Sequence, residues 1–273
     1  MTVSETGRVM IVAAPGDEIE TSGIVRLEPD GTPHRDYEPV GYDGIAVLQD
    51  APVASQDRAV RYRVTRGNAQ FTGTPDSYPH SFPQHIELVR VHPAPPPAPG
   101  DRAAIAAIDD LFGRTGISAG SVRSFTVLWA GDLDGPDGES ERLTVLAVEL
   151  PDGPYYVIGV VGGNAPGQRT TSSCGSEILP SSAGVDQPVL VLRCPSSSGP
   201  GRATEGTLVV VAPPRATTGR ALDARGEQIA RFPLADGVAV VPFPADLASV
   251  AVSDANGETV DEGVPMGQAD FGD

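Results

Sequence analysis

The feature that most constrains the fold is the regular punctuation of the chain, in which short apolar runs alternate with turns rich in glycine and proline. The 32 Gly and 27 Pro residues follow no collagen-like period, so they indicate many turns between short strands. Dipeptides typical of hairpin turns recur at Gly67-Asn68, Asp137-Gly138, Asp152-Gly153, Arg225-Gly226, Asp236-Gly237 and Asn256-Gly257. We therefore expect a mainly β (α+β) protein.

The first module is predicted over 1–92 as a small β-barrel or sandwich, of which an OB-like barrel is one form. Its expected strands are 22–32, 44–50, 59–73 and 85–91, and the first ends in a Pro-Asp-Gly turn. The arginines 58, 61, 63 and 66 are interpreted as a solvated strand face. A proline-rich linker over 93–100 ends this module.

The second module is predicted over 101–200 as a helix packed on an antiparallel sheet. Residues 101–114 place Ile105, Ile108, Leu111 and Phe112 at helical spacing, with Asp101 as the N-cap and Gly113 near the end. The sheet is expected to contain the strands 124–131, 142–150, 155–161 and 188–194, and the first three should form a meander.

The third module, 201–262, is predicted as a small β-sandwich that follows a flexible joint. Its expected strands lie within 207–214, 220–244 and 247–260. Residues 263–273 form an acidic tail, which we expect to be disordered.

Charge and composition exclude several classes of function. The net charge is −17, and 1–92, 101–200 and 201–273 contribute −5, −6 and −6. Because no segment carries the positive field that a phosphate backbone requires, we expect neither a nucleic acid nor an anionic lipid surface as a partner. The chain contains no lysine, which excludes a Schiff base with pyridoxal phosphate and a P-loop lysine. No cofactor is predicted.

Cys174 and Cys194 are the only cysteines, too few for a cysteine metal site. Cys194 ends an apolar strand and Cys174 follows a Thr/Ser loop, a geometry that suits a disulfide, with two free thiols as the alternative. A disulfide implies an extracytoplasmic location. No apolar run approaches the roughly 20 residues of a membrane span. The chain is thus either cytoplasmic, or extracytoplasmic with its signal or membrane anchor absent from this sequence.

The segment "GISAG" (116–120) matches the G-x-S-x-G pattern of a hydrolase nucleophile elbow. The elbow needs a strand before the serine and a helix after it, whereas the order expected around Ser118 is the reverse. All four histidines precede Ser118, which also contradicts the order of an α/β-hydrolase triad. His80, His85 and His92 do not converge from one strand face, so we interpret them as surface residues rather than zinc ligands.

Two loops are candidate binding sites. The segment 131–141 offers oxygen ligands for a weak calcium site at Asp132, Asp134, Asp137 and Glu139, although it does not match the EF-hand register and a solvated hairpin loop is the alternative. Residues 162–187 form the longest irregular stretch that the pattern predicts, beginning with a glycine-rich loop. We expect any binding surface there first, at Gly162, Gly163, Asn164 and Arg169.

The strand-and-turn pattern "FTVLWAGDLDG…LTVLAVELPDGPYYVIGVVGG", followed by "ALDARGEQIARFPLADGVAVVP…VAVSDANGE", resembles uncharacterised envelope-anchored ectodomain proteins of high-GC Gram-positive bacteria, over about 120–260. The resemblance implies an extracytoplasmic or cell-envelope location, with an unknown protein or envelope component as partner and membrane attachment only through an anchor. The function expected is non-catalytic binding or scaffolding. The alternatives are a cytosolic β-rich accessory protein and a hydrolase whose carboxylate site is not identified.

Overall fold

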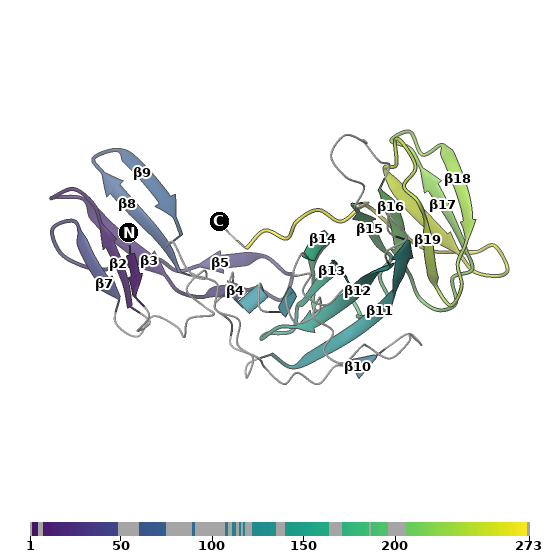
Figure 1. The fold of residues 1–273 in the computed structure, drawn as a ribbon, viewed down its shortest axis with the longest axis horizontal. Helices are drawn as coiled ribbons and strands as arrows, with labels where there is room; N and C mark the ends of the chain where they lie inside the picture. The colour runs from purple at the N-terminus through teal and green to yellow at the C-terminus, as the bar shows by residue number, and fades with distance from the viewer. Residues whose placement is uncertain are drawn as a thin grey trace.

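The computed structural model describes residues 2–4, 8–48, 60–74, 89–90, 107–108, 111–112, 115, 117, 122–134, 140–163, 171–185, 187–195 and 206–271. The molecule is elongated, with β2, β3 and β7 to β9 at one end, β4 and β5 in the middle, and the strands that follow residue 206 at the other end (Figure 1). All named elements are β-strands, which confirms the prediction of a mainly β protein.

The central sheet has five strands in the order β10-β11-β12-β13-β14. Their bounds are β10 Val89–Arg90, β11 Ser124–Asp134, β12 Ser140–Glu149, β13 Tyr155–Gly163 and β14 Thr171–Leu179. The strands β11 to β14 form an antiparallel meander, and β12 turns into β13 at Asp152 and Gly153. Both residues have positive φ, as a tight hairpin of this kind requires.

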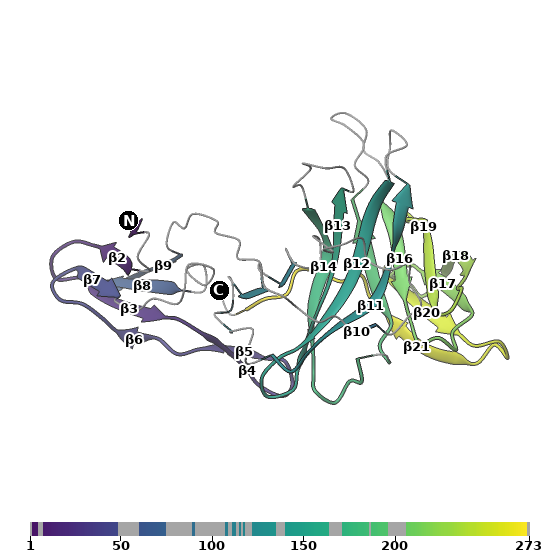
Figure 2. The ribbon, with the colours of Figure 1, turned by 60° about the horizontal axis from the view of Figure 1, so that its bottom comes forward.

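Two further sheets lie beyond the central sheet. The middle sheet has the order β15-β16-β19, and the outer sheet has the order β18-β17-β20-β21. Their bounds are β15 Leu190–Cys194, β16 Thr207–Val211, β17 Thr218–Leu222, β18 Gln228–Pro233, β19 Val238–Pro242, β20 Ser249–Ser253 and β21 Thr259–Gly263. Figure 2 shows the three sheets side by side.

Strand alternation explains why the sheets stack, because successive side chains enter different cores. On β12, Leu143 and Val145 pack toward the middle sheet, whereas Leu146 and Val148 face the opposite core. The middle sheet is likewise buried on both faces: Leu192 faces the central sheet, and the neighbouring Val191 faces the outer sheet. The predicted C-terminal sandwich corresponds to the middle and outer sheets. The strand predicted over 188–194 was wrongly assigned to the sheet of the second module, because β15 pairs with β16 in the middle sheet.

The N-terminal strands form two small sheets and a hairpin. The sheet orders are β1-β2-β7 and β6-β3-β8-β9, and β4 pairs with β5. The bounds are β1 Thr2–Ser4, β2 Arg8–Val12, β3 Glu18–Ser22, β4 Val25–Leu27, β5 Pro33–Arg35, β6 Glu38–Pro39, β7 Ile45–Leu48, β8 Arg61–Arg66 and β9 Ala69–Gly73. Val9, Ile11, Ile19 and Ala46 form their common core. The described strands do not close into a barrel, which corrects the barrel and OB-like alternatives, because the two sheets keep separate edges.

The β4–β5 hairpin extends from this module to the central sheet. Val25 and Leu27 of β4 are buried in the core on the face of the central sheet that points away from the middle sheet. The carbonyl of Pro29 accepts hydrogen bonds from the backbone N–H and the hydroxyl of Ser181, at 2.9 and 3.0 Å. The predicted Pro-Asp-Gly turn at 29–31 is confirmed, and it docks on the loop after β14.

Two predictions about the central sheet need correction. The helix predicted over 101–114 is not supported, because no helix is among the elements of the described residues. Ala107, Ile108, Leu111 and Phe112 are nevertheless buried in the same core as Val25. The apolar spacing thus indicated which side chains are buried, although it did not establish a helix. A side chain is buried when it faces the sheet, whatever element carries it.

The strand predicted over 85–91 was assigned to the first module, but its described residues, β10, pair in parallel with β11. A sequence pattern identifies a strand without identifying its neighbour.

The prediction of a disordered tail is also wrong for residues 264–271, which we call the C-terminal strap. Met266, Ala269 and Phe271 are buried, the last of them completely. The Met266 N–H donates to the Val191 carbonyl of β15, and the Gly267 carbonyl accepts from the Ser176 N–H of β14, both at 2.8 Å. The acidic composition suggested disorder, but the interspersed apolar residues bind the strap to two sheet edges.

Candidate functional site

Cys174 and Cys194 form the predicted disulfide. It joins β14 of the central sheet to the end of β15 of the middle sheet, with the two Cα atoms 4.3 Å apart. Both residues are buried within the core that the two sheets share. Since the bond lies inside the protein, its role is to hold the sheet stack together.

Part of the predicted binding loop over 162–187 is sheet, because β13 ends at Gly163 and β14 covers Thr171–Leu179. Gly162 and Gly163 complete β13 and pair with β12, and Gly162 also pairs with Thr171 of β14. Asn164 and Arg169 lie outside the described residues. The interpretation of 162–187 as one irregular stretch is wrong, because 171–179 form an edge strand whose small polar residues lack the apolar alternation of its neighbours.

The predicted calcium ligands are only partly described. Asp132 lies on β11 and its carboxylate is 3.7 Å from the Arg142 guanidinium of β12, whereas Asp134 ends β11. Asp137 and Glu139 lie outside the described residues, as do Ser118, His80, His85 and His92. Within the ranges that the structure describes, no three His, Cys, Asp or Glu side chains converge as a metal ion would require.

The arginines of β8 form the solvated face that the sequence suggested only in part, since the side chain of Arg66 is 60% exposed, and Arg58 lies outside the described residues. Arg61 is buried, and Arg63 stacks on the Tyr37 ring while its guanidinium lies 3.4 Å from Glu20. Arg66 donates two hydrogen bonds to the carboxylate of Asp17, at 2.8 and 2.6 Å. This forked contact lowers the pKa of Asp17, so the pair fixes the end of β8 against β3.

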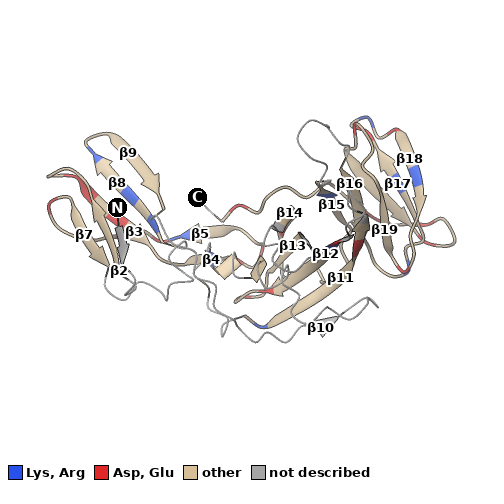
Figure 3. Ribbon diagram, viewed as in Figure 1, with Lys and Arg blue, Asp and Glu red and all other residues tan. Residues whose placement is uncertain are grey.

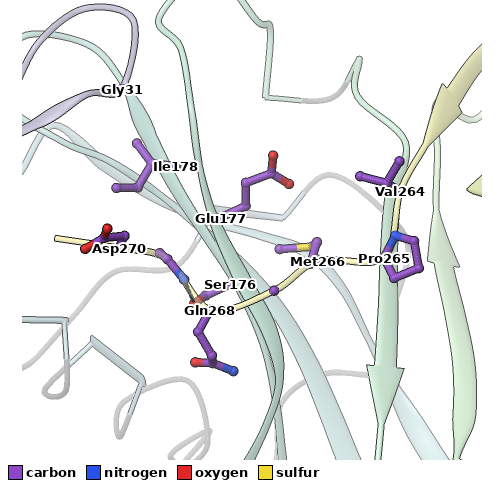
Figure 4. Close-up of a pocket in the computed structure, with 11 residues that line it drawn as sticks. Gly31, Ser176, Glu177, Ile178, Val264, Pro265, Met266, Gln268 and Asp270 are labelled. Atoms are coloured by element: carbon purple, nitrogen blue, oxygen red, sulfur yellow. Dashed lines mark hydrogen bonds between the residues drawn. The ribbon is translucent and has the colours of Figure 1, made fainter. Parts of the chain in front are cut away.

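A pocket of about 320 Å³ lies between the strap, β14 and the turn of the β4–β5 hairpin (Figure 4). Its lining residues come from three distant parts of the chain and are Gly31, Ser176, Glu177, Ile178, Val264, Pro265, Met266, Gly267, Gln268, Ala269 and Asp270. The sequence analysis named none of these residues individually, although Ser176, Glu177 and Ile178 lie within 162–187, where it expected a binding surface first. The one available signal was Phe271, a lone aromatic residue in an otherwise acidic tail.

One wall of the pocket is formed where the strap lies close against the backbone of β14. Gly175 adopts a φ of +131°, and a Cβ there would lie 2.8 Å from the Met266 carbonyl oxygen. Glycine is therefore needed for the strap to approach β14 so closely. Beside it, the buried Ser176 hydroxyl accepts a 2.9 Å hydrogen bond from the Ala269 N–H. The strap is thus held at a defined distance from the strand.

Glu177 is one of two acidic residues that line the pocket. Within the described part of the chain its carboxylate has no hydrogen-bond or ion-pair partner, and desolvation by partial burial raises its pKa. The other acid of the pocket, Asp270, points away from Glu177 (Figure 4). This arrangement suits the binding of a positively charged group at Glu177 better than acid–base catalysis, which needs two groups facing one reacting bond.

The fold and the buried disulfide define the class: a disulfide-stabilised, mainly β protein built on three stacked sheets. Among the described residues, no helix has the length and hydropathy that crossing a bilayer requires. Comparison of the chain with protein-family models gave no match, and comparison with curated proteins gave no significant match.

Proposed function

We propose that the protein is a non-catalytic, extracytoplasmic component of the cell envelope that binds a partner protein. The buried disulfide supports the location, because such bonds persist in oxidising compartments and are rare in the cytosol. The resemblance of 120–260 to envelope ectodomains agrees with it.

The pocket beside the strap is the observation that carries the binding role. Its walls combine the N-terminal hairpin, the central sheet and the C-terminal strap, so a ligand there contacts all three. Glu177 offers a carboxylate that has no partner among the described residues, and the apolar side chain of Met266 lies on the same side of β14 (Figure 4). A lysine or arginine side chain of a partner fits this combination, since its aliphatic stem can pack on the apolar wall while its charge meets the carboxylate.

The location is tested by the redox state of the cysteines in the source cells. Cells are quenched with acid, and free thiols are then alkylated under denaturing conditions with a reagent that adds a known mass. We expect Cys174 and Cys194 to react only after reduction. Alkylation of both cysteines without reductant would show a reducing compartment and would favour the cytosolic accessory protein.

The binding role is tested by titrating the isotope-labelled protein with N-acetyl-lysine methylamide and following backbone amide shifts by NMR. Saturable shifts are expected at the amides of 176–178 and 266–269. The variant Glu177→Gln should weaken the apparent affinity at least about fivefold, because it removes the charged acceptor. Glu258→Gln is the matched control, since Glu258 is exposed on the β20–β21 turn. Equal effects of both substitutions, or no saturation, would refute a cation site at Glu177.

A further inference from the structure

Two arginines lie directly opposite each other on the outer sheet. Arg220 of β17 pairs in register with Arg231 of β18. The residues next to them, Ala221 and Phe232, point into the core shared with the middle sheet. Because side chains alternate along a strand, both guanidinium groups belong to the opposite face of the outer sheet. Figure 3 shows the blue segments of β17 and β18 next to each other.

Neither guanidinium has a partner within the described residues. The Nε atom of Arg220 is buried without a hydrogen bond, as are the Nε atoms of Arg63 and Arg142. Arg63 and Arg142, however, each contact a carboxylate through another nitrogen, Arg63 that of Glu20 and Arg142 that of Asp132. Arg220 thus differs from the other two in having no acid to neutralise it.

The arrangement is unfavourable for the protein alone. Like charges directly opposite on neighbouring strands destabilise a sheet. The same row of this face continues through Ala251 to Glu262 on β21, yet no ion pair joins Glu262 to either arginine in the described structure. A chain with 36 acidic residues therefore leaves this adjacent pair of arginines uncompensated.

We infer that Arg220 and Arg231 form a binding site for a phosphate group on the outer face of the third sheet. Directly opposite residues place their Cβ atoms about 5 Å apart, so two guanidinium forks can reach the oxygens of one bound anion. A phosphate monoester carries close to two negative charges at neutral pH and neutralises both arginines, whereas a single carboxylate neutralises one. Thr218 lies two residues before Arg220 on the same face of β17, and its hydroxyl can donate to a remaining oxygen.

The test is calorimetric titration of the full chain with inorganic phosphate at constant ionic strength, with chloride as the balancing anion. Saturable binding is expected, and Arg220→Gln and Arg231→Gln should each weaken it at least about tenfold, because each removes a charged donor. Arg225→Gln is the matched control, since Arg225 is exposed on the turn of the same hairpin and changes the net charge equally. Its affinity should stay within about twofold of the wild type.

Any of three binding results would overturn the inference: no saturable phosphate binding, an equal loss of affinity in the Arg225 variant, or malonate binding as tightly as phosphate.

Thermal stability gives a second measurement that a purely structural role of the arginines would not reproduce. Without phosphate, Arg231→Gln should unfold at the same temperature as the wild type or higher, because repulsion is relieved. Phosphate should raise the midpoint of the wild type and leave that of Arg231→Gln unchanged. A variant that is destabilised without phosphate would refute the site.

Discussion

Replacing Phe271 by alanine tests the docking of the C-terminal strap, on which the pocket depends. The ring of Phe271 is completely buried and lies with its centroid 5.5 Å from that of Tyr156 on β13. Its carbonyl accepts a 3.2 Å hydrogen bond from the Nε–H of Arg35, which belongs to the N-terminal hairpin. The last described residue of the chain thus holds the hairpin and the central sheet together.

The expected loss follows from this burial. Truncating a fully buried phenylalanine in a closed core costs about 3–5 kcal/mol of unfolding free energy. The strap is not a strand of any sheet, so without its aromatic anchor it can leave the central sheet and admit water instead of keeping a cavity. We therefore expect the lower end of that range, about 3 kcal/mol.

Urea unfolding measures the loss through the midpoint, provided that the slope is unchanged. Val264→Ala is the control, because Val264 lies on the same strap with 62% of its surface exposed, and it should cost less than about 0.5 kcal/mol. Hydrogen exchange supplies a local measurement at the N–H groups of Ser176, Met266 and Ala269, which the strap contacts protect. Rapid exchange of these amides in the wild type, or a Phe271→Ala midpoint equal to that of the control, would refute the docked strap.

Two further predictions concern the disulfide and an ion pair. The double variant C174A/C194A should lose about 3 kcal/mol of unfolding free energy, because closing a 20-residue loop restricts the unfolded chain, and the reduced wild type should show a similar loss in urea. Equal midpoints for the oxidised and reduced wild type would contradict this. Because Arg66 lowers the pKa of Asp17 in the folded state, this pair should stabilise the protein above the ordinary carboxyl pKa and lose its effect as the pH falls through the lowered value. Asp17→Asn should remove that part of the pH dependence of the urea midpoint, and parallel curves for the two proteins would contradict the assignment.

Local patterns predicted a large part of the sheet structure. The Asp-Gly turns at 152–153 and 236–237 adopt the positive φ that their residues favour, and the first of them joins β12 to β13 in the meander. The disulfide was also predictable, because a chain with two cysteines offers one pairing. In contrast, β14 was missed, since its sequence of small polar residues lacks the apolar alternation by which strands are recognised. Neither the pocket nor the arginine pair was predicted, because each depends on which strands are neighbours.

The sequence by itself determined that the chain forms short strands with tight turns, which cysteines pair, and that the surface is strongly acidic. These properties follow from local periodicity, turn chemistry and composition. Only the tertiary structure decided that the sheets stack in three layers, that 264–271 dock as a strap and that Glu177, Arg220 and Arg231 have no neutralising partner among the described residues. Such features depend on contacts between residues far apart in the chain. Many pairings satisfy the same local pattern, and the packing of whole sheets selects one of them.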